Sequence, residues 1–116
     1  RRMAGEPVRV EVNSDTDGRS LTASIWHEGH TMGNALRFAL TKNPTVELAA
    51  YTMPHPAEPK INVRLQLTPQ AHKGGLQATD VLRQGVDDVK QMMEHILTVF
   101  DESLAAFEGD PMEEQD

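Results

Sequence analysis

The chain has 116 residues, 38% of them hydrophobic, and no cysteine, which predicts one domain with a modest core and excludes disulfides, a thiol nucleophile and cysteine-ligated zinc. Its net charge of −7 is unevenly distributed, because residues 1–78 carry +2 and residues 79–116 carry −9. The acidic second part would repel a phosphate backbone, so the charge argues against an autonomous nucleic-acid binder.

Two segments near the N-terminus, residues 8–13 and 21–26, alternate between apolar and polar side chains, which is typical of strands with one buried face. Asp17-Gly18 lies in the polar stretch between them, and glycine accepts the positive φ of a tight turn at no steric cost. We therefore expect one antiparallel hairpin. Its apolar face would consist of Val8, Val10, Val12, Leu21, Ala23 and Ile25.

A helix is predicted over residues 31–42. Its apolar residues recur at the spacing of one helix face, and they are Met32, Ala35, Leu36, Ala39 and Leu40. Thr31 is a suitable N-cap, because its hydroxyl can accept a hydrogen bond from a free amide of the first turn. Asn43-Pro44 ends the helix, since proline disfavours helical geometry in the residue before it. Phe38 lies outside the apolar stripe, which predicts a second contact surface.

A second hairpin is expected from residues 46–51 and 61–68, which again alternate. In its first strand the row Val46, Leu48 and Ala50 alternates with Glu47, Ala49 and Tyr51, and in its second strand the apolar row is Ile61, Val63, Leu65 and Leu67. Three prolines within residues 54–59 fix φ and withhold backbone donors, so the connection is a stiff loop. Residues 69–75 are predicted to be a flexible connector to the last helix.

The last predicted helix runs from Thr79 to about Phe107 and is the longest element. It contains no proline, and its only glycine is Gly85. Apolar residues are spaced 4, 3, 4, 3 and 4 apart along it, as in a helix that packs along another helix. We call this set the seam: Leu82, Val86, Val89, Met93, Ile96 and Phe100, continued after a slip of one position by Leu104 and Phe107.

The length of this helix predicts a partner. About 29 residues at ~1.5 Å each span ~43 Å, whereas a compact domain of this size has a radius of gyration of only about 13 Å. The helix would therefore extend past its own sheet and leave the seam from Met93 onward uncovered. An exposed apolar surface of that kind marks a partner site. From Leu82 to Val89, packing on the chain's own sheet is the simpler expectation.

Together these elements predict an α+β fold of order ββαββα: a two-layer sandwich with a four-stranded, mainly antiparallel sheet, two helices on one face and a long C-terminal helix. Residues 1–107 would form the domain, and residues 108–116, with five acids, an acidic disordered tail. No apolar run approaches the roughly 18 residues of a membrane span, and residues 1–5 lack the apolar stretch of a secretory signal.

The five histidines are the residues most open to a catalytic or metal-binding interpretation. His27 and His30 lie beside the predicted start of the first helix, and His55 or His72 could supply a third ligand, but nothing in the spacing makes the ligands converge. The helix start at residues 29–34 could bind an anion, although a short glycine motif is weak evidence. No serine lies in a nucleophile elbow, so we expect no catalytic residue, metal or cofactor.

Three separated motifs resemble the small alpha-like subunit of cellular RNA polymerases. They are His30-Thr31-Met32-Gly33-Asn34-Ala35-Leu36-Arg37, then Lys42-Asn43-Pro44-x-Val46-Glu47, then Ala49-Ala50-Tyr51-x-x-Pro54-His55-Pro56. The resemblance covers about residues 18–107. The family includes the archaeal L subunit and is distantly similar to the dimerisation domain of bacterial alpha. Pro54-His55-Pro56-x-Glu58, followed by Asn62-x-Arg64-x-Gln66, resembles most the form shared by RNA polymerases I and III.

The resemblance implies a non-catalytic subunit that pairs with a larger alpha-like subunit, and a heterodimer that seeds assembly of the polymerase core in the nucleus (nucleolus and nucleoplasm). The large core subunits would be further partners and would hold the catalytic Mg²⁺. No base-specific nucleic-acid contact, membrane, metal or cofactor is implied, and the motif residues would have structural roles. The partner interface would consist of Leu82, Val86, Val89, Met93, Ile96, Phe100 and Leu104, flanked by Phe38.

Three alternatives stay open. The motifs leave room for the equivalent subunit of RNA polymerase II. The residues alone also allow a self-associating module in which two long helices pair about a two-fold axis. A small ligand-binding enzyme that uses His30 and the helix start is the third, and it predicts a pocket in which polar groups converge near His27, His30 and His55.

Overall fold

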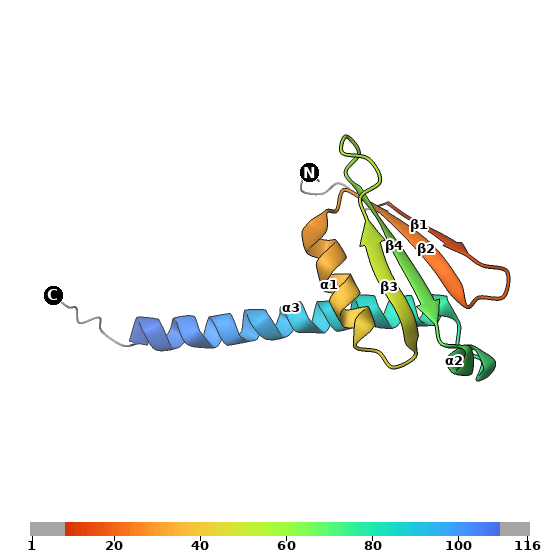
Figure 1. Ribbon diagram of the computed structural model, residues 1–116. Coiled ribbons are helices and arrows are strands. Elements are labelled where there is room, and N and C mark those ends of the chain that lie inside the picture. Colours follow the sequence, from red (N-terminus) through yellow and green to blue (C-terminus); the bar gives the residue numbers. More distant parts are fainter. Residues whose placement is uncertain (1–8, 110–116) are drawn as a thin grey trace.

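The structure is a computed structural model, which describes residues 9–109 (Figure 1). Its elements are β1 (Val10–Ser14), β2 (Ser20–Trp26), α1 (His30–Thr41), β3 (Val46–Thr52), β4 (Lys60–Leu67), α2 (Pro69–Lys73) and α3 (Ala78–Gly109). The four strands form one antiparallel sheet in the order β1-β2-β4-β3. With α1 and α3 packed on one face of this sheet, the predicted α+β sandwich is confirmed.

The core lies between the sheet and the two long helices. Alternation directs every second residue of β2 and β4 toward this layer, and the apolar stripe of α1 packs against these residues. The largest fully buried side chains are Leu21, Leu36, Leu40, Ile61, Val63, Leu65 and Leu67. Helix α3 adds Ala78, Val81 and Val89, all from its first half.

Strand β3 departs from the expected alternation. Its register against β4 shifts by one residue between Val46 and Leu48. Such a bulge reverses the direction of every later side chain, so Ala49 and Tyr51 join Val46 in packing against the core. Leu48 is 45% exposed instead. The expected row of Val46, Leu48 and Ala50 is therefore wrong after its first member.

Two local expectations are also wrong. Helix α1 begins at His30 with Gly29 as its N-cap, and no side chain caps it, so Thr31 is not the cap. The predicted flexible connector contains α2, because Pro69 occupies the first turn and the Thr68 hydroxyl accepts a hydrogen bond from the Ala71 amide at 3.1 Å. A side-chain cap and an N-terminal proline both favour a helix start.

The crossing of α1 and α3 depends on one close approach. A Cβ atom placed on Gly85 would lie 2.5 Å from Cδ2 of Leu40, which is fully buried. Only glycine lets the two helix backbones come this near without displacing the core. A larger residue at position 85 would therefore have to displace Leu40 or move α3 away from α1.

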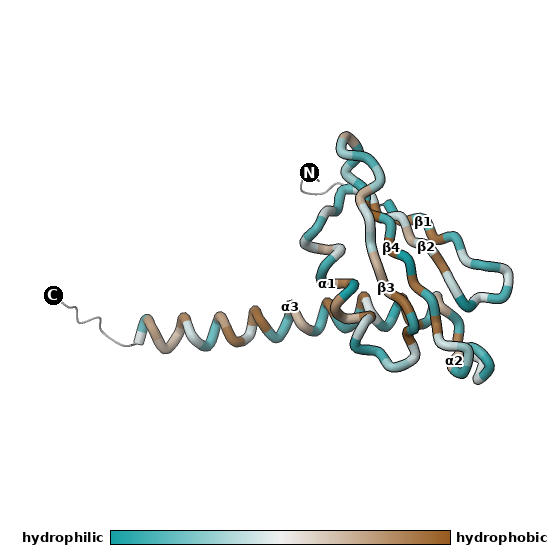
Figure 2. The backbone as a smooth tube through the Cα atoms, in the orientation of Figure 1, coloured by the Kyte–Doolittle hydropathy of each residue, from teal (hydrophilic) through white to brown (hydrophobic). Residues whose placement is uncertain are grey.

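Helix α3 extends far past the sheet (Figures 1 and 2). Its 32 residues span ~48 Å, and the chain measures 65 × 36 × 22 Å with a radius of gyration of 18.6 Å. Val89 is the last buried residue of α3, and all of residues 93–109 are exposed. We call residues 93–109 the far half of α3. The predicted protrusion is confirmed.

The end of α3 lies inside the predicted acidic tail. Glu108 and Gly109 are helical, and the rest of the tail, residues 110–116, lies outside the described residues. Val8 of the first predicted strand lies outside them as well. Within residues 9–109, no helix combines the length and the apolarity of a membrane span.

The β1–β2 turn is fastened to the start of α3. Gly18 has a φ of +80°, and its carbonyl accepts a hydrogen bond from the Ala78 amide at 2.8 Å. A Cβ atom on Gly18 would lie 1.8 Å from Oε1 of Gln77. His72 Nε2 lies 2.6 Å from the Asp17 carbonyl, so α2 holds the same turn from its other side.

We expect Gly18→Ala to lower the free energy of unfolding by about 1–2 kcal/mol, because alanine resists a positive φ and its methyl group displaces Gln77. Gly74→Ala is the matched control, since Gly74 has a φ of −75° and a Cβ there makes only ordinary contacts. Urea unfolding followed by circular dichroism measures both. Equal stabilities of the two variants would contradict the expectation.

Candidate protein interface

The far half of α3 presents a continuous apolar face to solvent. The far half contains no proline, and its only glycine is Gly109 at the helix end, so the apolar spacing of the sequence becomes a straight stripe. Ile96 is 55% exposed and Phe100 59%. Figure 2 shows the apolar residues continuing along α3 beyond the sheet. The large exposed side chains are Met93, Ile96, Leu97, Val99, Phe100, Leu104 and Phe107.

The near half of the seam divides between core and surface. Val89 is buried in the chain's own core and Leu82 packs against that core, so contact of either residue with a partner stays a prediction. Val86 is 51% exposed, although core packing was the simpler expectation there. The docked face of α3 runs through Val81, Gly85 and Val89, and Val86 lies about 100° around the helix from Gly85.

An apolar groove continues this surface between α3 and the hairpin. Val10 and Val12 face the helix side of the sheet, because they pair with Ile25 and Ala23, yet they are 51% and 43% exposed. The hollow beside Val10 has a volume of about 380 Å³, and its only charged lining residues are Glu28 and Lys90. The other residues that line it are Val10, Ile25, Met32, Leu36, Val86, Val89 and Met93.

Val10 and Val12 are residues that the sequence analysis did not assign to an interface. Their alternation showed which way the side chains point, and that orientation is confirmed. Alternation does not predict whether a helix covers these side chains. Because α3 runs beside β1 rather than over it, β1 stays uncovered.

Phe38 lies on α1 outside the buried stripe, as its spacing predicted. Its ring is 51% exposed, and the Lys42 ammonium group lies 4.7 Å from the ring centroid. A cation over an exposed ring is worth about 0.5–1 kcal/mol, which holds both side chains in place. Whether a partner covers Phe38 stays a prediction.

The first and third sequence motifs meet in space. His30 Nδ1 lies 2.9 Å from the Tyr51 hydroxyl, and the two rings are edge to face. Gly33 is buried against the Tyr51 ring, where a Cβ atom would lie 2.5 Å from Cδ2. These contacts fasten the start of α1 to β3.

The remaining motif residues shape turns or lie on the surface. Asn34 accepts a hydrogen bond from Arg37 at 3.0 Å. The Asn43 side chain accepts from the amide and the hydroxyl of Thr45 at 2.9 and 2.7 Å, which directs the chain from α1 into β3. Like His30, Asn34 and Arg37, five further motif residues are exposed, and they are Thr31, Pro44, Pro54, His55 and Pro56.

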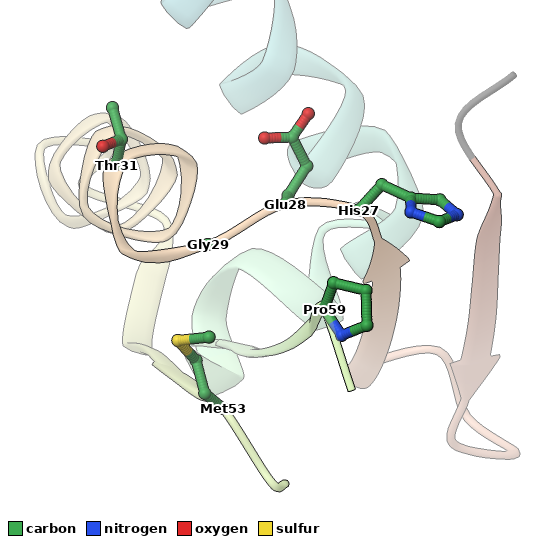
Figure 3. A pocket seen from close by; sticks show the side chains of 6 residues that line it. All are labelled: His27, Glu28, Gly29, Thr31, Met53 and Pro59. Atoms are coloured by element: carbon green, nitrogen blue, oxygen red, sulfur yellow. The ribbon is translucent and has the colours of Figure 1, made fainter. Parts of the chain in front are cut away.

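The histidines do not assemble into a site. A hollow of about 500 Å³ lies beside His27 and Glu28, but Figure 3 shows the side chains of these two residues and of Thr31 pointing in different directions. Neither His30 nor His55 lines it, so the convergence required by the enzyme alternative does not occur there. Among residues 9–109, no three His, Asp or Glu side chains gather as metal ligands would.

This fold defines a class of protein: a small α+β domain from which one long helix protrudes with an exposed apolar face. The profile of the RNA polymerase Rpb3/Rpb11 dimerisation domain matches residues 20–99. The chain belongs to that family, and the resemblance seen in the three motifs is confirmed.

Individual proteins agree with this assignment. Subunit RPAC2 of the DNA-directed RNA polymerases I and III of Schizosaccharomyces pombe is 39% identical over 101 residues, which cover 87% of this chain and 77% of that protein. The protein of that name from Saccharomyces cerevisiae is 38% identical over 88 residues, 76% of this chain and 58% of that protein. Subunit L of the Thermoplasma acidophilum RNA polymerase shares the fold, with a TM-score of 0.70, 17% identity and coverage of 91% of this chain and 98% of that chain.

Proposed function

We propose that this chain is a non-catalytic assembly subunit of RNA polymerases I and III. The observation that carries the proposal is the far half of α3, whose apolar face is exposed from Met93 to Phe107. The similar proteins of two yeasts are named as subunits of these two polymerases. The proposal places the chain in the nucleus, in both the nucleolus and the nucleoplasm.

The partner in this proposal is the larger alpha-like subunit, and the heterodimer would seed assembly with the large core subunits. Burying a large apolar side chain stabilises by about 1.5–3 kcal/mol, so four or five anchors suffice for a stable complex. The proposed anchors on α3 are Met93, Ile96, Phe100 and Leu104, with Val86 at the groove and Phe38 on α1 beside them.

Three features support a role in assembly rather than in chemistry or in base recognition. The acids of α3 are spread along a solvent-exposed helix rather than paired in a cleft. His30 and His72 are each engaged by neighbouring groups of the fold, Tyr51 and the Asp17 carbonyl. The negative charge of α3 also opposes direct contact with a phosphate backbone.

Co-expression with the larger alpha-like subunit tests the proposal. We expect a 1:1 complex that survives gel filtration, whereas the chain alone should sediment as a monomer or aggregate through its uncovered face. Purification of the tagged chain from cells should recover the largest subunits of polymerases I and III. Recovery of those of polymerase II would assign the chain to that enzyme, and a stable dimer of the chain alone would favour the self-associating module.

A further inference from the structure

The acids of α3 follow a regular pattern. Its only cations are Arg83 and Lys90, so the far half contains no Lys or Arg. Of its seven acids, five follow one another at intervals of seven residues: Asp80, Asp87, Glu94, Asp101 and Glu108. The other two are Asp88 and Glu102. Within the described residues, the three ion pairs all lie outside α3, so none of the acids of α3 is held in an ion pair there.

Helical geometry places the acids of the far half beside the apolar face. At about 100° per residue, the apolar side chains of the far half occupy a face roughly 160° wide. Glu94, Asp101 and Glu108 follow one border, and Glu102 lies at the other. The middle of the opposite side is uncharged, since Gln91, Thr98 and Ala105 lie there.

The apolar face is also broader than a single neighbouring helix covers. A two-helix coiled coil buries two positions in every seven and commonly has charged residues beside them. In the far half the neighbouring positions are apolar too, because Leu97 and Leu104 widen one side and Val99 the other. A surface of this width is buried by a groove formed from at least two elements.

We propose that an apolar groove of the partner subunit, with Lys and Arg along its rims, receives the far half of α3, and that the acidic borders select this partner over a second copy of this chain. The inference rests on the proposed function and adds the chemistry of the partner's surface. Opposite charges around an interface favour the matching partner, and like charges exclude the wrong one.

A second copy of this chain fits the acidic borders poorly. Two α3 helices laid side by side would bring acidic borders together with no Lys or Arg in either far half. The groove between α3 and β1 has Glu28 and Lys90 beside Val10 and Arg83 beside Val12, two isolated cations and one acid, and so offers no continuous basic rim. The like charge along α3 thus acts against self-pairing while the apolar face stays available.

Two variants with the same change in net charge test the placement of the acids. The border variant carries Glu94→Gln, Asp101→Asn and Glu102→Gln, and the control variant carries Gln91→Lys, Thr98→Lys and Ala105→Lys. Each raises the net charge by three, the first by removing negative charges at the borders and the second by adding positive charges on the opposite side. The dissociation constant for the larger alpha-like subunit is measured at low and high ionic strength, and self-association of each free chain by sedimentation.

At low ionic strength we expect the border variant to bind about tenfold more weakly than the unmodified chain, and the control variant to change less than threefold. The difference should shrink at high ionic strength, because salt screens exposed pairs, and the border variant should self-associate more readily. Equal losses in the two variants, no loss in the border variant, or a stable dimer of the unmodified chain would each overturn the inference. If the unmodified chain does not bind the larger alpha-like subunit at all, the proposed function fails instead.

Discussion

A chain that carries Ile96→Asp and Phe100→Asp is expected to lose its complex with the larger alpha-like subunit and to keep its own fold. The two side chains are 55% and 59% exposed, so in the free chain the new carboxylates stay in water and cost little. In the complex they would be buried without a partner, at about 3–5 kcal/mol each. The affinity should therefore fall by at least about a hundredfold.

Thr98→Asp with Ala105→Asp is the matched control, because it adds the same two charges on the opposite side of the far half. This variant should bind almost normally. Co-purification measures the complex, and thermal unfolding by circular dichroism measures the free chain. A complex that survives the Ile96 and Phe100 changes would contradict the interface, and an unfolded free chain would contradict their exposure.

The second large effect is expected inside the free chain, where α1 and α3 cross. Leu40→Ala should lower the free energy of unfolding by about 2–5 kcal/mol, because Leu40 is fully buried and its removal leaves a cavity. Gly85→Ala should cost about 1–3 kcal/mol by overpacking, since its new methyl group would lie 2.5 Å from Leu40 Cδ2.

The double variant separates crowding from a general weakening of the core. Once Leu40 is shortened, the methyl group at position 85 enters the space left behind. The double variant should therefore lose less stability than the two single variants together, and the difference in the free energy of unfolding should be at least about 1 kcal/mol. Urea unfolding of all four chains measures this coupling. Strictly additive losses would show that Gly85 does not set the crossing of the two helices.

Local pattern predicted the elements because strands and helices have different periods. The alternation in β2 and β4 and the stripe of α1 each recorded a buried face, and both faces are buried in the structure. Local pattern could not predict the bulge in β3, because the bulge is a shift in the pairing of β3 with β4, a strand distant in the sequence. The short helix α2 was missed although Thr68-Pro69 carried a helix-start signal.

The candidate interface was predicted in part for the same reason. Length and spacing identified the exposed positions from Met93 onward, since a helix longer than its domain must protrude. They could not separate Val86 from Val89, which have similar spacing but different exposure. The direction in which α3 crosses α1 decides that difference, and it depends on the contact between Gly85 and Leu40.

By itself, the sequence determined which segments fold as strands and helices, which faces are apolar, and that one helix is too long for its own domain, because period and length are properties of neighbouring residues along the chain. Only the tertiary structure decided that β1 stays uncovered, that Val89 belongs to the core, and that Val86 borders a groove. Those outcomes depend on how α3 is placed across the sheet, which is set by contacts between residues far apart in the chain.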